Sequence, residues 1–332
     1  MSLPSKYIVR LGKFVWTTMW QVMMSQLAPS NKSGAYIRPE SQFRNSVSQD
    51  SKHPPASQRY RLFVGMGCPW AHRTLVVRAL KGLEEAISVS IVYPSSSEGI
   101  WLLKEPFSSC NTVPELYELA RKGYQGRCTV PILWDEETNT IVNNESAEII
   151  EILNSQFNQY ADNAELDLYP AELKDKCDRF NEEIYHKVNN GVYRCGFAQT
   201  QSAYETACNE LFATLDELDE HLATNRYLCG ETLTLADVRF FTTLVRFDVV
   251  YFSLFKCSKQ RIRHYKHLGE YLKELYQLPK VADTCDPDSV KQDYYGNLFP
   301  LNPGGIIPLG SNLEYLQQPH NRHNLSKASV WQ

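Results

Sequence analysis

The stretch YRLFVGMGCPWAHRTLVVRALK, residues 60–81, joins an apolar segment to a helical pattern through one short turn. Residues 60–64 are predicted to form a short buried strand. A turn with two glycines then leads to Cys68 and Pro69, and a helix is predicted over residues 70–81. Proline suits the first helical position, where the backbone N–H would have no partner. A reactive side chain on such a turn is typical of an α/β fold.

The next segments follow the order of a thioredoxin-like unit. Alternating apolar residues predict a second strand at 87–92, and residues 129–134 and 140–142 predict two more, joined by a polar turn. A helix is expected to begin at residues 144–146. Residues 94–126 are expected to hold at most two short helical pieces. The resulting order is β-α-β followed by β-β-α.

The second half of the chain is predicted to be helical. Leucines 211, 215, 218 and 222 recur at helical spacing, and Thr234 with Asp237 forms a capping-box-like start. The predicted fold is therefore an α/β thioredoxin-like N-terminal domain followed by an all-α C-terminal domain. The predicted organisation is an extension at 1–56, the thioredoxin-like domain at 57–158, the helical domain at 165–285 and a tail at 286–332.

Composition excludes several classes of protein. The 332 residues suffice for two domains, and 43% of them are hydrophobic. A net charge of −4, from 34 basic and 38 acidic side chains, gives no reason to expect a nucleic-acid partner. No run of apolar residues approaches the roughly 20 residues that a membrane-spanning helix needs. We expect a globular protein without a membrane span.

Cysteine usage indicates a reducing compartment. The nine cysteines have an odd count, scattered spacings and no CxxC pair, so a disulfide framework is not expected. The eight histidines do not cluster with the cysteines, which argues against a metal site. Free thiols of this kind predict a cytoplasmic protein.

The N-terminus leaves a second compartment open. No acidic residue precedes Glu40, whereas Lys6, Arg10 and Lys13 accompany an apolar stretch that includes Trp16 and Trp20. Such a segment has the composition of a mitochondrial presequence. An ordinary N-terminal helix or arm is the equally weighted alternative.

Three local signals point to chemistry. Cys68 at a helix N-terminus would face free amides that favour a reactive thiolate, although a buried structural cysteine is the alternative. A cis bond at Val130-Pro131 would free the Val130 backbone to pair with a peptide, although the position taken alone favours an ordinary trans proline at an edge strand. Glu145 and Ser146 could hold an ammonium and a carboxylate, or simply cap the helix. Together, and in this order, these signals describe a site for glutathione.

These segments resemble the glutathionyl-hydroquinone reductases, the Xi class of glutathione transferases, over about residues 36–310. The motifs similar to the family's are CPWAHRT at 68–74, RCTVPILWD at 127–135, NESAEII at 144–150, NNGVY at 189–193, RFDVVY at 246–251 and DYY at 293–295. Shorter matches lie near Arg38, at Phe43-Arg44-Asn45 and at Asn302-Pro303.

The resemblance implies a role for each matching residue. Cys68 is expected to be the nucleophile and Tyr193 the proton donor to the leaving hydroquinone. Tyr251 and Tyr294, rather than Tyr295, are expected to line an aromatic pocket and to hydrogen-bond the thiolate. Glutathione is expected to contact Trp101, Arg127, Cys128, Thr129, Val130, Glu145 and Ser146.

The resemblance also implies a reaction and partners. Glutathione would be the co-substrate, a glutathionyl-hydroquinone the aromatic substrate, and a Cys68–glutathione mixed disulfide the intermediate, with no metal involved. A homodimer is expected. The alternatives are an omega-like thioltransferase or dehydroascorbate-type reductase, a conventional conjugating transferase, and a non-enzymatic protein that reuses the fold for binding.

Overall fold

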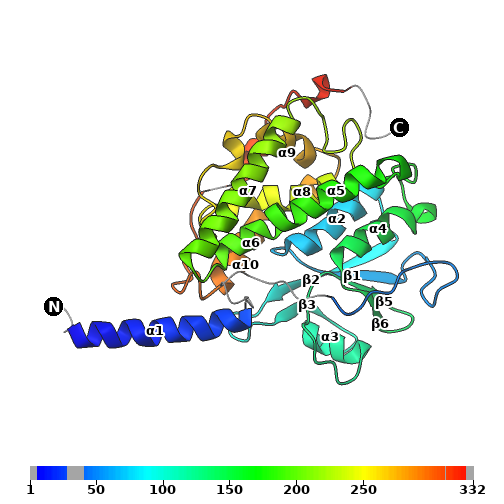
Figure 1. Ribbon diagram of the computed structural model, residues 1–332. Coiled ribbons are helices and arrows are strands. Elements are labelled where there is room, and N and C mark those ends of the chain that lie inside the picture. The colour runs from blue at the N-terminus through cyan, green and yellow to red at the C-terminus, as the bar shows by residue number, and fades with distance from the viewer. Residues whose placement is uncertain (1–5, 28–40, 311, 327–332) are drawn as a thin grey trace.

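The computed structural model describes residues 6–27, 41–310 and 312–326, so the matching position Arg38 lies outside the described residues. Figure 1 shows a sheet with helices on both of its faces, covered on one side by a larger helical layer. A long N-terminal helix, α1 (Lys6–Leu27), projects from this body. The two-layer architecture confirms the predicted thioredoxin-like and all-α combination.

The sheet has the strand order β4-β3-β2-β1-β5-β6. β1 pairs with β2 in parallel, and the other neighbours pair antiparallel. The parallel pair is joined through α2 (Pro69–Lys81), as the quoted stretch predicts. The strand bounds are β1 (Tyr60–Gly65), β2 (Ile87–Pro94), β3 (Trp101–Phe107), β4 (Cys110–Thr112), β5 (Ile132–Asp135) and β6 (Thr140–Asn143).

The segment 94–126 differs from its prediction. It contains the hairpin β3–β4 before the helix α3 (Val113–Ala120), instead of helical pieces alone. β3 lies towards the edge of the sheet, and residues 104–106 within it are exposed. A strand in that position need not alternate between apolar and polar residues, so its sequence pattern is weak.

The start of β5 also differs. This strand begins at Ile132 and not at residue 129, because Pro131 has no N–H for the sheet ladder. The Val130–Pro131 peptide bond is cis, which settles the choice that the sequence left open.

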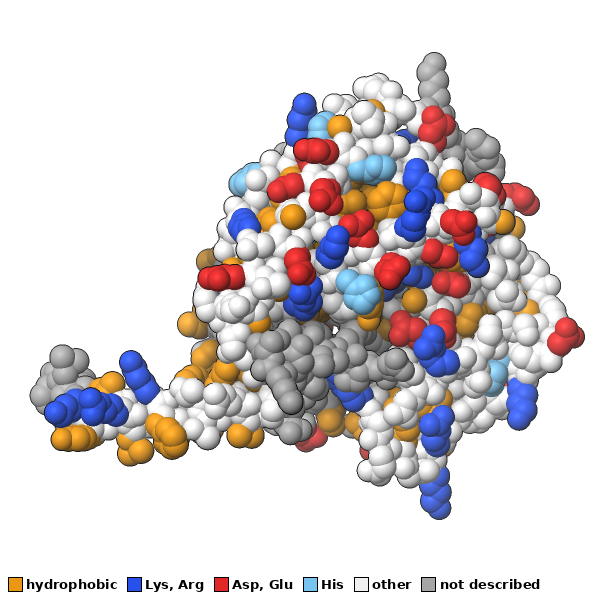
Figure 2. All heavy atoms as spheres, in the orientation of Figure 1, with side chains coloured by type: hydrophobic (Ala, Val, Ile, Leu, Met, Phe, Trp, Pro, Cys, Tyr) orange, Lys and Arg blue, Asp and Glu red, His pale blue; other side chains and the backbone are white. Residues whose placement is uncertain are grey.

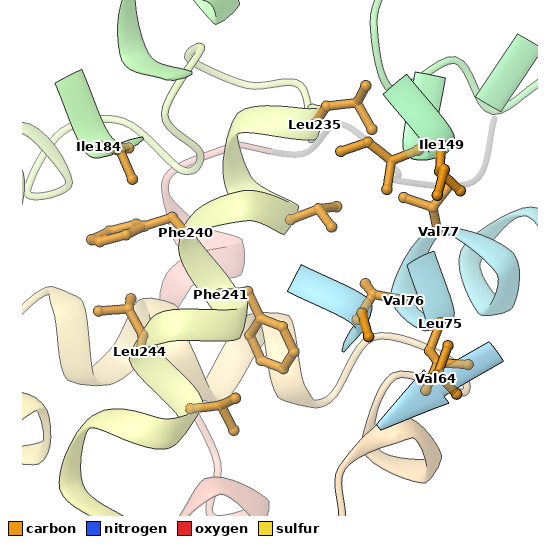
Figure 3. Packing of buried hydrophobic residues seen from close by; sticks show 14 of the residues in the cluster. Val64, Leu75, Val76, Val77, Ile149, Ile184, Leu235, Phe240, Phe241 and Leu244 are labelled. Carbon is orange, nitrogen blue, oxygen red and sulfur yellow. The ribbon is translucent and has the colours of Figure 1, made fainter. Parts of the chain in front are cut away.

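The helices α2 and α4 (Ser146–Ser155) pack between the sheet and the helical domain. Figure 3 shows Val76 and Val77 of α2 and Ile149 of α4 facing the helix that contains Leu235 and Phe241, namely α8. This shared core fixes the two domains together. The remaining helices are α5 (Lys174–Ile184), α6 (Gly191–Gly196), α7 (Gln201–His221), α8 (Leu235–Arg246), α9 (Leu268–Tyr276) and α10 (Pro287–Asn297).

The two predicted end segments contain buried residues and a helix. The predicted extension 1–56 includes Phe43 and Val47, which are buried in the core. The predicted tail 286–332 includes α10, whose N-terminus is capped by Asp286. Among the described residues, no helix is long and apolar enough to cross a bilayer.

Candidate active site

Cys68 stands where β1 turns into α2. It is the residue that immediately precedes the helix, and Pro69 takes the first helical position. Its backbone N–H donates to Gly65 O at 3.0 Å, and its partly exposed thiol lies 3.5 Å from Val130 O. The sulfur therefore lies at the end of α2 where free amides and the helix dipole favour a thiolate.

A cavity of about 360 Å³ opens beside the sulfur. Some of the predicted site residues line this cavity and others do not. The group that lines the cavity comprises Cys68, Trp101, Arg127, Thr129, Val130, Tyr193 and Tyr294.

The second group does not line the cavity and comprises Cys128, Glu145, Ser146 and Tyr251. Cys128 falls there, although its neighbours Arg127 and Thr129 line the cavity. Burial raises the pKa of the Cys128 thiol, which argues against a second nucleophile. Glu145 accepts hydrogen bonds from Ala147 N at 3.1 Å and from the Ser41 hydroxyl at 3.0 Å. Ser146 is buried and lies 3.4 Å from a guanidinium nitrogen of Arg73.

Three tyrosine hydroxyls form a chain that runs inward from the cavity: Tyr193 and Tyr294 line it, and Tyr251 is buried behind them. Tyr294 on α10 lies 2.6 Å from the hydroxyl of Tyr193 on α6 and 3.0 Å from the hydroxyl of Tyr251. Tyr251 ends η4 (Phe247–Tyr251), a π-helical turn that continues α8. Tyr295 points elsewhere, because its hydroxyl lies 3.4 Å from Val249 O. The chain thus joins the three tyrosines that the resemblance singles out.

These hydroxyls stay protonated near neutral pH. Burial raises the pKa of Tyr193, Tyr251 and Tyr294. The negative charge that Cys68 can carry raises the pKa of Tyr193 and Tyr251 further. Each phenol is therefore a hydrogen-bond donor, and two of them, Tyr193 and Tyr294, share the cavity with the sulfur.

The turn that carries Cys68 is held from behind by Arg246, whose role the sequence analysis missed. This buried guanidinium donates to Met66 O at 2.7 Å and to Gly67 O at 3.1 Å. It also lies 2.7 Å from Nδ1 of His72. Arginine only donates, so Nδ1 accepts and Nε2–H donates to the Thr284 hydroxyl at 2.8 Å. Burial, together with the charge of Arg246, lowers the pKa of His72 and keeps the ring neutral.

Asp293 holds the same turn from the cavity side. Its carboxylate accepts from Gly67 N at 2.9 Å, and burial raises the pKa of Asp293 to about 6. The place of Arg246 at the start of a matched motif, at the end of α8, is the signal that could have revealed it. Asp293 could have been found only from its place beside Tyr294 in a matched motif.

The N-terminal segment adds lining residues that the sequence analysis also missed. Ser41, Gln42 and Asn144 border the cavity. Phe43 N donates to Asn144 Oδ1 at 3.1 Å, and Asn144 N donates back to Phe43 O at 3.0 Å. Within the described parts of the chain, no cluster of His, Cys, Asp and Glu side chains could hold a metal ion.

Comparison with known proteins agrees with this geometry. The family model described as "Glutathione S-transferase, N-terminal domain" matches residues 67–156, and the one described as "Glutathione S-transferase, C-terminal domain" matches residues 201–274. The first match includes Cys68 and α4, and the second runs from α7 into α9.

Relatives cover nearly the whole chain. Glutathionyl-hydroquinone reductase PcpF of Sphingobium chlorophenolicum is 43% identical over 303 residues, which are 89% of this chain and 94% of the relative. Glutathionyl-hydroquinone reductase YqjG of Escherichia coli K12 is 41% identical over 324 residues, 93% of this chain and 96% of the relative. The glutathione-bound structure of YqjG superposes with a TM-score of 0.80 at 42% identity, covering 85% of this chain and 96% of that one. This chain therefore belongs to the Xi class of glutathione transferases, the family of the glutathionyl-hydroquinone reductases.

Proposed function

We propose that this protein uses glutathione to reduce glutathionyl-hydroquinones to hydroquinones. The names of PcpF and YqjG support this reaction. The observation that carries it is the position of Cys68: at a helix N-terminus, in a cavity, beside a chain of protonated tyrosines. A thiolate attacks sulfur, and a phenol protonates carbon, so one site holds both reagents that the reaction needs.

The first step breaks the bond between the substrate's sulfur and its aromatic ring. The Cys68 thiolate attacks the sulfur and forms a mixed disulfide with the glutathionyl group. The electron pair of the broken carbon–sulfur bond leaves with the hydroquinone carbon. Tyr193 supplies the proton that this carbon needs, while Tyr251 and Tyr294, linked to it through their hydroxyls, stabilise the charge of Cys68 through the one proton that the chain leaves free.

The second step regenerates the enzyme. A second glutathione thiolate attacks the glutathione sulfur of the mixed disulfide, giving glutathione disulfide and the free Cys68 thiolate. The aromatic ring has been reduced by two electrons, and two glutathione sulfurs have been oxidised to one disulfide.

Glutathione is proposed to lie along the cis Val130–Pro131 turn. The Val130 backbone would pair with its peptide, as Trp101, Arg127 and Thr129 border the same space. Its γ-glutamyl end would point to the N-terminus of α4, where Glu145 and Ser146 would hold it after small movements of the neighbouring Ser41. Cys128 would contribute backbone atoms only.

Compartment and assembly are part of the same proposal. All nine cysteines are free thiols, which supports the cytoplasm, and the mitochondrion is the alternative. A reporter fused to residues 1–39 that enters mitochondria would exclude the cytoplasmic assignment. We propose a homodimer, and a molar mass of one chain by light scattering would exclude it.

The central test replaces the nucleophile. Cys68→Ser should lower the turnover of a glutathionyl-hydroquinone by roughly a thousandfold or more, because serine is not ionised near neutral pH. Cys128→Ser is the matched control and should keep most of the activity. After incubation with glutathione disulfide, mass spectrometry should find one glutathionyl adduct, on Cys68. Full turnover by Cys68→Ser would disprove the mechanism, and a gain in conjugation alone would favour the conjugating transferase.

A further inference from the structure

The helix α1 exposes its apolar side chains to solvent. Nine of the fifteen large hydrophobic residues that are exposed in the described chain belong to it, among them Leu11 at 64% and Phe14 at 68% exposure. Figure 2 shows these side chains along the helix that projects from the body. A continuous apolar surface of this kind on a globular protein marks a binding site.

The charges of α1 lie on one side. Lys6, Arg10 and Lys13 are spaced by four and three residues, which places them on a common face. Thr17 and Gln21 continue that polar stripe. The helix contains no Asp or Glu. All charges on its polar face are therefore positive, and apolar side chains occupy most of the remaining circumference.

One end of α1 is fixed to the body. Met24 is fully buried, Trp20 packs against the core, and the ring of Trp16 lies 6.4 Å from that of Phe299. Upstream of Trp16 the side chains of α1 are exposed. The exposed surface is therefore held in a definite orientation relative to the fold.

These features select the occupant. The helix is not long and apolar enough to cross a bilayer, but a cationic stripe opposite a broad apolar face with Trp, Tyr and Phe is the pattern of helices that lie in the membrane interface. A second copy of α1 would bring three more cations and no acidic residue to the contact. We propose that α1 attaches this protein to the surface of a membrane that contains anionic lipids.

The attachment has a consequence for the substrate, which rests on the proposed function. Phe299, the partner of Trp16, follows Asn297 and Leu298, and both of these line the cavity. A bilayer that receives α1 would therefore lie close to the cavity mouth. The glutathionyl group of the substrate is charged, so the substrate would arrive from water, whereas the uncharged hydroquinone product would be released beside the bilayer.

The test is co-sedimentation of the full chain with lipid vesicles. One set of vesicles contains phosphatidylcholine only, and the other also contains phosphatidylglycerol. We expect binding to the anionic vesicles that high salt releases. The variant Lys6→Ser/Arg10→Ser/Lys13→Ser should bind about a hundredfold more weakly, since each basic residue near an anionic surface strengthens binding about fivefold. Leu11→Ser/Phe14→Ser should also lose binding.

The matched control removes three exposed lysines elsewhere, as Lys52→Ser/Lys122→Ser/Lys266→Ser, and should bind like the wild type. All variants should turn over a water-soluble substrate at the wild-type rate, so failure of the proposed reaction would be visible independently of vesicle binding. Absence of binding to anionic vesicles would overturn the proposal. The proposal would also be overturned if the wild type bound no vesicles and Leu11→Ser/Phe14→Ser changed a dimer into a monomer. Removal of α1 from the mature protein in cells would overturn it as well.

Discussion

At the scale of single residues, the tyrosine chain limits how protons are arranged. Tyr193, Tyr294 and Tyr251 have three hydroxyl protons, and the two hydrogen bonds between them use two. One proton is left to donate to sulfur or to the leaving carbon. If Tyr193 gives it up, Tyr294 donates to Tyr193 and Tyr251 donates to Tyr294. The roles predicted separately for the three residues are thus linked.

The first prediction tests this link. Losing a hydrogen bond to a charged sulfur costs about 1.5–3 kcal/mol, so Tyr251→Phe should raise the pH at which iodoacetamide alkylates Cys68 by roughly one to two units. In the linked chain, adding Tyr294→Phe should move the curve little further. Tyr295→Phe is the control and should leave the curve in place. Additive shifts from the two substitutions would show that the hydroxyls act independently.

At the scale of elements, the turn between β1 and α2 is packed on both sides. A Cβ on Gly65 would lie 2.5 Å from the ring of Trp101, and a Cβ on Gly67 would lie 2.6 Å from Asp293. Arg246 of α8 and Asp293 of α10 bind the backbone of the same turn. Three elements distant in sequence therefore set the position of Cys68.

Gly65→Ala tests this packing. The added methyl group must displace the Trp101 ring, which borders the cavity, so the KM for glutathione should rise severalfold while the protein loses about 1–3 kcal/mol of stability. Gly269→Ala is the control, because its Cβ would meet its nearest neighbour at 3.4 Å, an ordinary contact. An unchanged KM in Gly65→Ala would mean that Trp101 does not shape the glutathione site.

At the scale of the whole molecule, a buried ion cluster ties the N-terminal segment to the sheet. Asp135 at the end of β5 accepts from Arg59 at 2.6 Å and lies 2.7 Å from His53 Nδ1. Burial opposes ionisation of this carboxyl, but the hydrogen bonds from Arg59 and His53 outweigh it and lower the pKa of Asp135 to about 2. The charged form therefore stabilises the fold.

This cluster predicts a pH dependence of stability. Because the folded pKa of Asp135 lies below its ordinary value of 3.8, its contribution is complete above about pH 4 and is lost as the pH falls towards 2. Asp135→Asn should cost about 3 kcal/mol at neutral pH, measured by urea unfolding, and should flatten the decline between pH 4 and 2. Asp50→Asn, at an exposed position, should change neither. If the free energy of unfolding of Asp135→Asn still declined between pH 4 and 2 as in the wild type, the decline would be due to other carboxyls.

The sequence by itself determined the strand–turn–helix around Cys68, the helical second half and the family, because periodicity, turn residues and contiguous motifs are local properties. The fold class and family are confirmed, while the individual residue roles stay predictions. Only the tertiary structure revealed the β3–β4 hairpin, the helix α10 within the predicted tail and the burial of Phe43. It also revealed that Arg246 holds Gly67, a residue 179 positions away. Such contacts form when distant elements pack, and no local pattern records which side chains then meet.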